Sequence, residues 1–335
     1  MSVWQSPGTQ HDGLAMTIYH STVQTRSASI RLSESDGRGE PLLLLHGSGA
    51  SRKVFSKQFD SELSERHRLI ALDLPGHGAS GDAESPADYG IDGLARTVAE
   101  VLEHKGIERT LVMGWSLGGH VGIELLARHP GVRGLMIVGA PPVGRGPVAM
   151  LRGFQTNLDL LLAAKEQFNE REAQRFYEMC YHGAGDPTFL QSIRRADGRV
   201  RVAVSKSLLR GDTADQKLAV EQANVPVAVV NGANEPVARL SYLAGLHYRN
   251  LWGNVCHIIP DAGHAPFWDQ PERFNELLGS FAADVVAKPV ATTPVVAEVT
   301  PPPAAAAPAA PTSAPASVRR GSHPGAGAVR SAARW

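Results

Sequence analysis

The sequence has few cysteines and no net charge, and it lacks any long apolar run. Its 335 residues include only Cys180 and Cys256, which lie far apart and outside any metal-ligand spacing, so a disulfide scaffold is not indicated. Basic and acidic residues balance at 33 each, so no overall field attracts nucleic acid or an anionic membrane. No stretch is apolar enough to span a bilayer, and the first residues do not resemble a signal peptide. We expect a cytoplasmic protein.

The composition changes after about residue 286. Residues 288–335 are rich in proline and alanine, have Glu298 as their only acidic residue, and contain no aromatic residue before Trp335. Such a segment cannot bury enough apolar surface to offset the loss of chain entropy, so we predict a disordered tail. Its arginines make the end basic, which by itself does not indicate a dedicated partner.

Short apolar runs alternate with amphipathic stretches through the rest of the chain. The runs end near glycine or proline, as strands buried on both faces do. They are residues 41–47, 68–76, 110–116, 134–140, 225–232 and 254–263. Residues 92–106 and 118–130 have helical spacing, and 16–32 alternates like an edge hairpin. This order predicts an α/β fold with a mostly parallel, doubly wound sheet.

Residues 144–223 break this alternation, because they contain helix signals and no strand run. Asn169 and Glu172, for example, have the spacing of a capping box. We predict a helical cap inserted between two core strands, over the carboxyl edge where open α/β sheets bind ligands. Residues 16–143 and 224–287 then form the two parts of the core.

The sequence GWSLGG, at residues 114–119, follows an apolar run and precedes a helical pattern. A strand, Gly-x-Ser-x-Gly and a helix in this order are the signature of a nucleophile elbow, in which the serine takes a strained conformation and the glycines permit tight packing. The motif alone is weak evidence. Its context favours Ser116 as a catalytic nucleophile over an ordinary glycine-rich turn.

A serine nucleophile needs a base and a group that orients the base. In chains with this elbow the order is serine, then acid, then histidine. His264 lies in the loop DAGHAPF after the last apolar run and is the predicted base. Glu235 is the first acidic residue after the run at 225–232 and is the predicted acid. Asp261 is the alternative acid, although its closeness to His264 in sequence makes a directed contact harder.

An oxyanion hole needs two backbone N–H groups directed at one point. Leu117, the residue after the nucleophile, is expected to supply one of them. Ser48, in the loop HGSGAS, is expected to supply the other, and its hydroxyl can add a hydrogen bond to the substrate. The loop does not continue into the Gly-Lys-Ser/Thr of a phosphate-binding loop, and no zinc-binding motif is present. We therefore expect neither a metal nor a cofactor.

The motifs occur in the order found in α/β-hydrolase-fold serine hydrolases, which the chain resembles over residues 16–286. LDLPGHGAS looks like the structural loop of that family, which implies a structural role for His77. GWSLGGHVGIELLARHPGVRGLMIVGAPPV, VAVVNGANEP and DAGHAPF resemble, more specifically, the metal-independent N-acyl-homoserine lactonases. Those enzymes use serine, histidine and, unusually, glutamate, which correspond here to Ser116, His264 and Glu235.

The resemblance also implies substrate contacts. A cap tyrosine contacts the lactone in that family, and Tyr177 is the candidate here, although Phe176 aligns about as well. The family has asparagine in the oxyanion loop where this chain has Ser48. Gly47 precedes the predicted oxyanion donor, and Trp115 precedes the predicted nucleophile. We expect both residues to lie beside the substrate.

The implied function is a cofactor-free serine hydrolase that opens acyl-homoserine lactones, a quorum-quenching activity. A general carboxylesterase and a non-catalytic receptor on the same fold are alternatives, because they share these motifs. The acyl chain is expected under the cap, near Phe154, Leu158, Leu161 and Phe168. Residues 1–15 precede the resemblance and are predicted to be a flexible extension. The sequence indicates a small-molecule partner and no particular oligomeric state.

Overall fold

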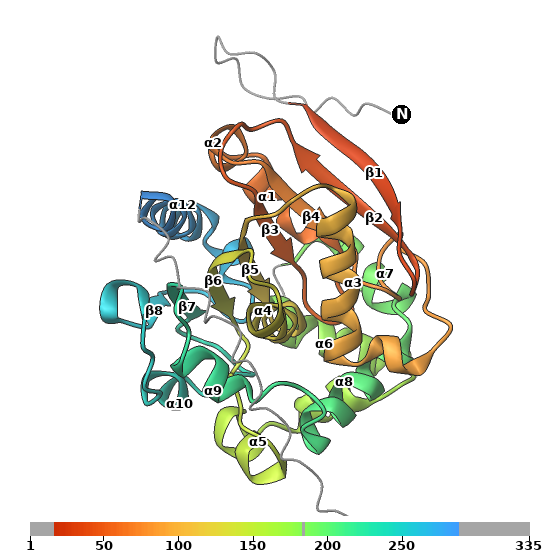
Figure 1. The fold of residues 1–335 in the computed structure, drawn as a ribbon. Coiled ribbons are helices and arrows are strands. Elements are labelled where there is room, and N and C mark those ends of the chain that lie inside the picture. The colour runs from red at the N-terminus through yellow and green to blue at the C-terminus, as the bar shows by residue number, and fades with distance from the viewer. Residues whose placement is uncertain (1–16, 183–184, 288–335) are drawn as a thin grey trace, which may run out of the picture. The chain divides into compact units, whose positions relative to one another are not determined.

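A computed structural model describes residues 17–182 and 185–287 (Figure 1). The chain divides into two compact units, Met1–Pro289 and Val290–Trp335. The predicted extension at 1–15 and the predicted tail lie outside the described residues, so the description concerns the first unit.

One eight-stranded sheet has the order β1-β2-β4-β3-β5-β6-β7-β8 (Figure 1). The pairs β1–β2 and β2–β4 are antiparallel and all other neighbours are parallel, which confirms the predicted mostly parallel sheet and the edge hairpin. The strands are β1 Ile18–Gln24, β2 Ser29–Ser35, β3 Leu42–Leu45, β4 Leu69–Leu72, β5 Thr110–Trp115, β6 Val132–Val138, β7 Val227–Gly232 and β8 His257–Ile259.

Helices cover both faces of the sheet. They are α1 Ser56–Phe59, α2 Leu63–Arg66, α3 Ile91–His104, α4 Leu117–Arg128, α5 Pro147–Gly153, α6 Glu170–Tyr181, α7 Pro187–Arg195, α8 Gly198–Arg210, α9 Gln216–Glu221, α10 Leu240–Ala244, α11 Pro266–Asp269 and α12 Pro271–Ala287. Short 3-10 helices are η1 Arg52–Phe55, η2 Pro86–Tyr89, η3 Leu158–Ala164 and η4 Trp252–Asn254.

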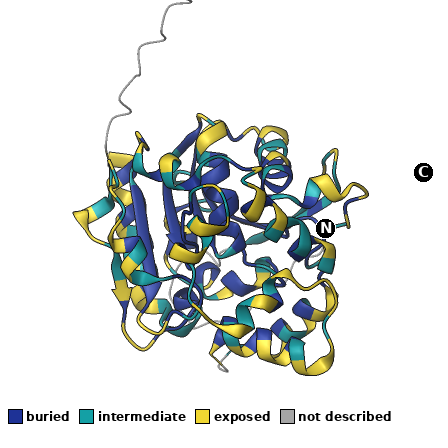
Figure 2. Cartoon of the chain, turned by 90° about the horizontal axis from the view of Figure 1, so that it is seen from below, coloured by how far each residue is buried: buried dark blue, intermediate teal, exposed yellow. Residues whose placement is uncertain are grey.

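Successive side chains of the central strands belong to two separate apolar clusters, one on each face of the sheet. In β3, Leu42 and Leu44 join a cluster that includes α12, whereas Leu43 and Leu45 join one that includes α3 and α4. This follows from the two-residue period of a strand, which sends successive side chains to opposite faces. Figure 2 shows the central strands as buried, whereas exposed residues lie on the surrounding helices and loops and on the edge strand β1. Burial on both faces explains the uninterrupted apolar runs in the sequence.

The segment between β6 and β7 is helical, as predicted. In α6, the Asn169 side chain accepts from the Glu172 N–H and the Glu172 side chain accepts from the Asn169 N–H, which confirms the predicted capping box. The last helix of the segment, α9, packs against α4 of the core and buries Val220. The elements α5 to α8 and η3 are called the cap below.

The strand order reverses direction between β3 and β5, because β4 lies on one side of β3 and β6 on the far side of β5. In open α/β sheets this switch point opens a crevice at the carboxyl ends of the strands, where ligands bind. The loop containing Ser48 follows β3, and Ser116 follows β5. The topology therefore places both at this crevice.

We predict that removal of the buried carboxylate of Asp73, which follows β4, lowers the stability of the fold strongly. It is fully buried, accepts from the Arg52 and Ala79 N–H groups at 2.7 and 2.8 Å, and pairs with the Arg52 guanidinium. Asp73→Ala leaves a buried cation unpaired and should lower the free energy of unfolding by about 3–5 kcal/mol in urea titrations. Asp82→Ala, which breaks a half-exposed pair with Arg195, should cost less than about 1 kcal/mol. Equal losses in the two variants would contradict this ranking.

Candidate active site

Ser116 lies at the sharp turn between β5 and α4, with φ 52° and ψ −117°. A non-glycine residue in this region is strained, and the surrounding packing must maintain it. A Cβ at Gly118 would overlap the Leu45 carbonyl, and one at Gly119 would lie 2.5 Å from the Ala140 Cβ. The glycines after the serine are thus required because α4 begins against the end of β3 and the loop after β6.

His264 and Glu235 form a buried pair. Nδ1 of His264 lies 2.8 and 3.0 Å from the two carboxylate oxygens of Glu235, and both side chains are almost fully buried. Glu235 Oε1 also accepts from the N–H groups of Val237 and Ala238, at 2.7 and 3.1 Å. These hydrogen bonds stabilise a carboxylate that has lost its contact with water. The contact between the carboxylate and the imidazole fixes the tautomer of His264, because Nδ1 then carries the proton directed at Glu235 and Nε2 is left as the acceptor.

The loops that carry this pair are connected through the backbone. The N–H of Ala233 donates to the Ile259 carbonyl, and the N–H of Asn234 donates to the Ala262 carbonyl, both at 2.9 Å. The N–H of Gly263 donates to Asp269 Oδ2 at 2.8 Å. The three donors, Ala233, Asn234 and Gly263, lie within two residues of Glu235 or His264, so these hydrogen bonds hold the two loops directly.

Asp261, the alternative acid, is exposed and takes a left-handed conformation with φ 55°. Its carboxylate makes no hydrogen bond to His264, whose Nδ1 is already held by Glu235. The structure therefore brings Glu235 to the histidine and leaves Asp261 at the surface.

Trp115 connects the nucleophile, the histidine loop and the cap. Its indole N–H donates to the His264 carbonyl at 2.7 Å. Its ring lies 5.5 Å from the His264 ring and 5.6 Å from that of Tyr181 on α6. The sequence predicted a substrate contact for Trp115; the structure places its side chain in the packing that holds these three elements together.

The predicted oxyanion loop lies against the nucleophile. A Cβ at Gly47 would lie 3.2 Å from the Ser116 Cβ and 2.9 Å from the Trp115 ring. Ser48 follows, and its buried hydroxyl has no hydrogen-bond partner within the described part of the chain. Leu117 is the first residue of α4, where N–H groups have no intrahelical acceptor and the helix dipole is positive. The residues predicted for the oxyanion hole are thus adjacent to Ser116, with polar groups available.

Two buried histidines, His46 and His77, pack beside the predicted oxyanion loop. His46 Nδ1 bonds the Gly47 carbonyl at 2.8 Å, and its Nε2 accepts from the Leu74 N–H at 3.0 Å. His77 Nδ1 bonds the Pro75 carbonyl, and its ring lies 5.0 Å from that of His46. Burial lowers the pKa of His46 to about 4 and the pKa of His77 to about 3. Both imidazoles are therefore neutral at physiological pH. Their burial and their hydrogen bonds to the backbone fit a structural role.

Gly139, after β6, is a site residue that the sequence analysis missed. It has φ 62°, and a Cβ there would lie 2.6 Å from Cε1 and 2.7 Å from Nδ1 of His264. Its N–H donates to the Asn231 side-chain oxygen at 2.9 Å. The sequence shows this glycine in the apolar run at 134–140 and no carboxylate after the run, but neither observation indicates a contact with His264. The His264 imidazole occupies the space beside this glycine, and Oε2 of Glu235 would lie 3.2 Å from the same Cβ.

The cap places Phe176, and not Tyr177, beside the oxyanion loop. A Cβ at Gly49 would lie 3.4 Å from the Phe176 ring, whereas the Tyr177 hydroxyl donates to the Gly185 carbonyl. Tyr181, which the sequence analysis did not single out, packs on Trp115 and is fully buried. Its spacing from Tyr177 on an amphipathic helix was the available signal. The cap side of the site is therefore aromatic.

The expected lining of the acyl-chain pocket is wrong for Leu158 and Leu161. These side chains are 78% and 69% exposed, so they face away from the core. The helix η3 buries only Leu162, and an apolar pattern cannot indicate which side of a short 3-10 helix meets the core. Phe168 packs on Phe176, with ring centroids 5.3 Å apart.

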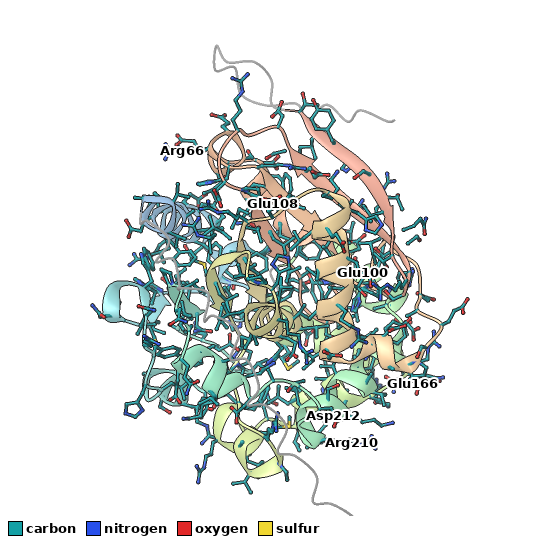
Figure 3. All side chains as sticks on the ribbon, in the orientation of Figure 1. Arg66, Glu100, Glu108, Glu166, Arg210 and Asp212 are labelled. Atoms are coloured by element: carbon teal, nitrogen blue, oxygen red, sulfur yellow. The ribbon has the colours of Figure 1, made fainter. Side chains whose placement is uncertain are left out.

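Two grooves of the described residues lie away from these groups. One of about 790 Å³ runs between α2 and α12, and one of about 370 Å³ runs between β8 and α12. Figure 3 shows the described side chains on the ribbon. No group of three or more metal-ligating side chains occurs within residues 17–182 and 185–287, and no helix there is long and apolar enough to cross a membrane.

Comparison with known proteins shows similarity over most of the chain. The alpha/beta hydrolase fold family matches residues 40–271. A variant of the N-acyl homoserine lactonase AidH, complexed with N-hexanoyl homoserine, is 38% identical, with 82% of this chain and 99% of that chain covered and a TM-score of 0.79. The pimeloyl-[acyl-carrier protein] methyl ester esterase of Nitrosomonas europaea is 30% identical, over 74% of this chain and 97% of the esterase. That of Yersinia enterocolitica is 29% identical, over 73% and 95%.

We predict that Gly139→Ala abolishes most hydrolysis, because the new Cβ displaces the His264 ring. Gly106→Ala is the matched control, since Gly106 has φ 63° and a Cβ there meets nothing within 4 Å. Both variants should lose about 1 kcal/mol of stability through backbone strain. Only Gly139→Ala should lose turnover of a nitrophenyl ester in a spectrophotometric assay. Similar turnover in the two variants would contradict the assigned packing.

We also predict a loss of stability on acidification. Burial lowers the pKa of His120 to about 4, as it does for His46, so the unfolded chain binds protons that the folded chain excludes. This stability is fully present above the unfolded pKa of about 6.5 and is lost as the pH falls toward 4, at roughly 2 kcal/mol per buried histidine by pH 5. Urea titrations at pH 7 and 5 measure it. His120→Asn should reduce the difference, and His247→Asn, whose side chain is 94% exposed, should not.

Proposed function

This chain belongs to the α/β-hydrolase fold family, and we propose that within it the protein opens the lactone ring of N-acyl-homoserine lactones with a Ser-His-Glu triad. The observation that carries the proposal is the buried Glu235–His264 pair beside the Ser116 turn. A glutamate in this position is uncommon in the wider superfamily. The 38% identity to a lactonase that binds N-hexanoyl homoserine supports the substrate class.

In the proposed reaction, the Ser116 hydroxyl attacks the ring carbonyl carbon while His264 Nε2 takes its proton. Nε2 is the atom available for this step, because Nδ1 is held by Glu235. The carboxylate also stabilises the imidazolium that forms. The triad is thus preorganised, since Trp115 holds the His264 carbonyl and two backbone N–H groups hold Glu235.

The negative charge that develops on the carbonyl oxygen needs donors that are already in place. The Leu117 and Ser48 N–H groups supply them in this proposal, and the positive end of α4 adds to their field. The Ser48 hydroxyl, buried and without a protein partner, offers a further donor where asparagine stands in the lactonases that the sequence resembles. An unpaired buried hydroxyl is costly unless a ligand satisfies it.

The ring C–O bond then breaks, and His264 returns the proton to the departing homoserine oxygen. The leaving alcohol remains tethered, because in a lactone it belongs to the same molecule as the acyl group. His264 next activates a water molecule, which attacks the acyl-serine ester and releases N-acyl-homoserine. The reaction as proposed uses the side chains of the protein and water.

A carboxylesterase acting on open-chain esters is the second candidate. The two methyl ester esterases, at 30% and 29% identity over most of their length, favour it. The same triad would act, with an alcohol that leaves the site after the first step. The substrate, and not the site geometry, separates the two candidates.

We expect Ser116→Ala to lower ring opening of N-hexanoyl-homoserine lactone about 10⁴-fold or more, with EDTA present throughout. Ser51→Ala is the matched control, because Ser51 is a buried serine of the neighbouring loop whose hydroxyl also has no partner in the described residues. The control should keep near-normal turnover. Retention of activity by Ser116→Ala would refute the triad. Wild-type turnover of nitrophenyl esters alone would favour the esterase.

A further inference from the structure

The cap exposes an unusual amount of aliphatic surface. Among the large hydrophobic side chains of the described residues, the four most exposed are Val148, Leu151, Leu158 and Leu161, at 64% to 78%. The next is Tyr19, at 55%, on the opposite part of the fold. All four lie within 14 consecutive residues on α5 and η3, so the exposure is concentrated and not scattered. A cluster of this kind indicates an interaction surface.

Both elements pack against α8. On the α5 side, Met150 and Phe154 turn inward to a cluster with Leu208. On the η3 side, the Ser205 hydroxyl donates to the Ala163 carbonyl at 3.2 Å. Val148 and Leu151 therefore project from the side of α5 that does not meet the core. Leu209, at 48% exposed, continues the surface on α8.

Cations lie on α5 and α8 and directly before α5. Arg145, Arg152, Lys206 and Arg210 are exposed and form no ion pair within the described part of the chain. The side chain of Arg145 lies against Gly211, which connects the start of α5 to the end of α8.

Acidic side chains on the same elements are fewer. Asp159 is paired with Arg175, and Asp212 lies beside Arg210 at the outer end of α8 (Figure 3). The excess charge of this surface is positive, although the whole chain is neutral.

We propose that this face of the cap, defined by Val148, Leu151, Leu158, Leu161 and the four cations, docks on an anionic phospholipid bilayer. Aliphatic side chains that enter the acyl boundary, flanked by arginine and lysine at the headgroup level, are the features of interfacial binding. The chain's neutral total charge hides this local arrangement, which explains why the composition gave no indication of a membrane partner.

A second copy of the chain fits the same face less well. A two-fold interface would bring the four unpaired cations of one copy against those of the other, and like charges at a buried rim oppose association. A bilayer with anionic lipids presents the complementary charge instead. The docking site is on the cap, and amphiphilic molecules with an acyl chain accumulate in bilayers, so docking would bring such substrates close to the catalytic serine.

The test is co-sedimentation of the full chain with vesicles of phosphatidylcholine alone or mixed equally with phosphatidylglycerol. Wild type should bind the mixed vesicles more strongly. Val148→Ser/Leu151→Ser should lower the partition coefficient about tenfold or more, because two aliphatic side chains no longer enter the bilayer. Arg152→Gln/Arg210→Gln should remove most of the preference for phosphatidylglycerol.

Tyr19→Ser/Val255→Ser is the matched control, since both residues are exposed and lie outside the cap. It should bind as wild type does, and all variants should hydrolyse a water-soluble ester at the wild-type rate, which shows that they are folded. Because binding is read without turnover, this test is independent of the proposed lactonase activity.

Three results would overturn the proposal. The first is the absence of wild-type binding. The second is equal binding by Val148→Ser/Leu151→Ser, which would assign the lipid affinity to another part of the chain, such as its arginine-containing end. The third is a wild-type dimer in analytical ultracentrifugation that this variant converts to monomer, because the face would then belong to a second copy.

Discussion

The reversal of the chain at Ser116 is the constraint on which the rest of the site depends. A serine at φ 52° directly after a buried strand is maintained only if neighbouring backbone packs tightly on both sides of it. Gly118 meets the end of β3, and Gly119 meets the loop after β6. The same contacts that hold the strained turn therefore bring the oxyanion loop and Gly139 to the nucleophile.

The remaining members of the site are held by side-chain and backbone hydrogen bonds between the loops. Trp115 bonds the His264 carbonyl and packs on Tyr181, so the residue before Ser116 also fixes the histidine loop and the cap. Hydrogen bonds from Ala233 and Asn234 connect the glutamate loop to the histidine loop. A shift of any one of these loops would be transmitted to the Glu235–His264 pair, which is why preorganisation here depends on packing rather than on the pair alone.

The sequence was sufficient to predict the parts of the structure that depend on local patterns. Apolar runs with two-sided burial located the central strands, the capping box located the start of α6, and the chain order of motifs selected Glu235 as the partner that His264 contacts. These features have signals within a few residues. The opposing predictions about Glu235 and Asp261 were separated only by the tertiary contacts, since both carboxylates precede the histidine.

Features that depend on contacts between distant segments were not predictable in the same way. Leu158 and Leu161 look like core residues in sequence, yet the orientation of η3 on α8 turns them outward. The contact of Gly139 with His264 requires the relative position of two loops that are 125 residues apart, which no local pattern contains. Tyr177 and Phe176 are adjacent, and only the packing of α6 decides which of them meets the oxyanion loop.

The most direct test of the central claim is a comparison of kcat/KM for N-hexanoyl-homoserine lactone and for the methyl ester of N-hexanoyl-2-aminobutyrate, its open-chain analogue. Acid release in a pH-stat, with EDTA present, follows both reactions in the same way. The account predicts faster hydrolysis of the lactone, because the site is proposed to hold a ring whose alcohol stays tethered. Rapid cleavage of the open ester with an inert lactone would contradict it and assign the same triad to an esterase.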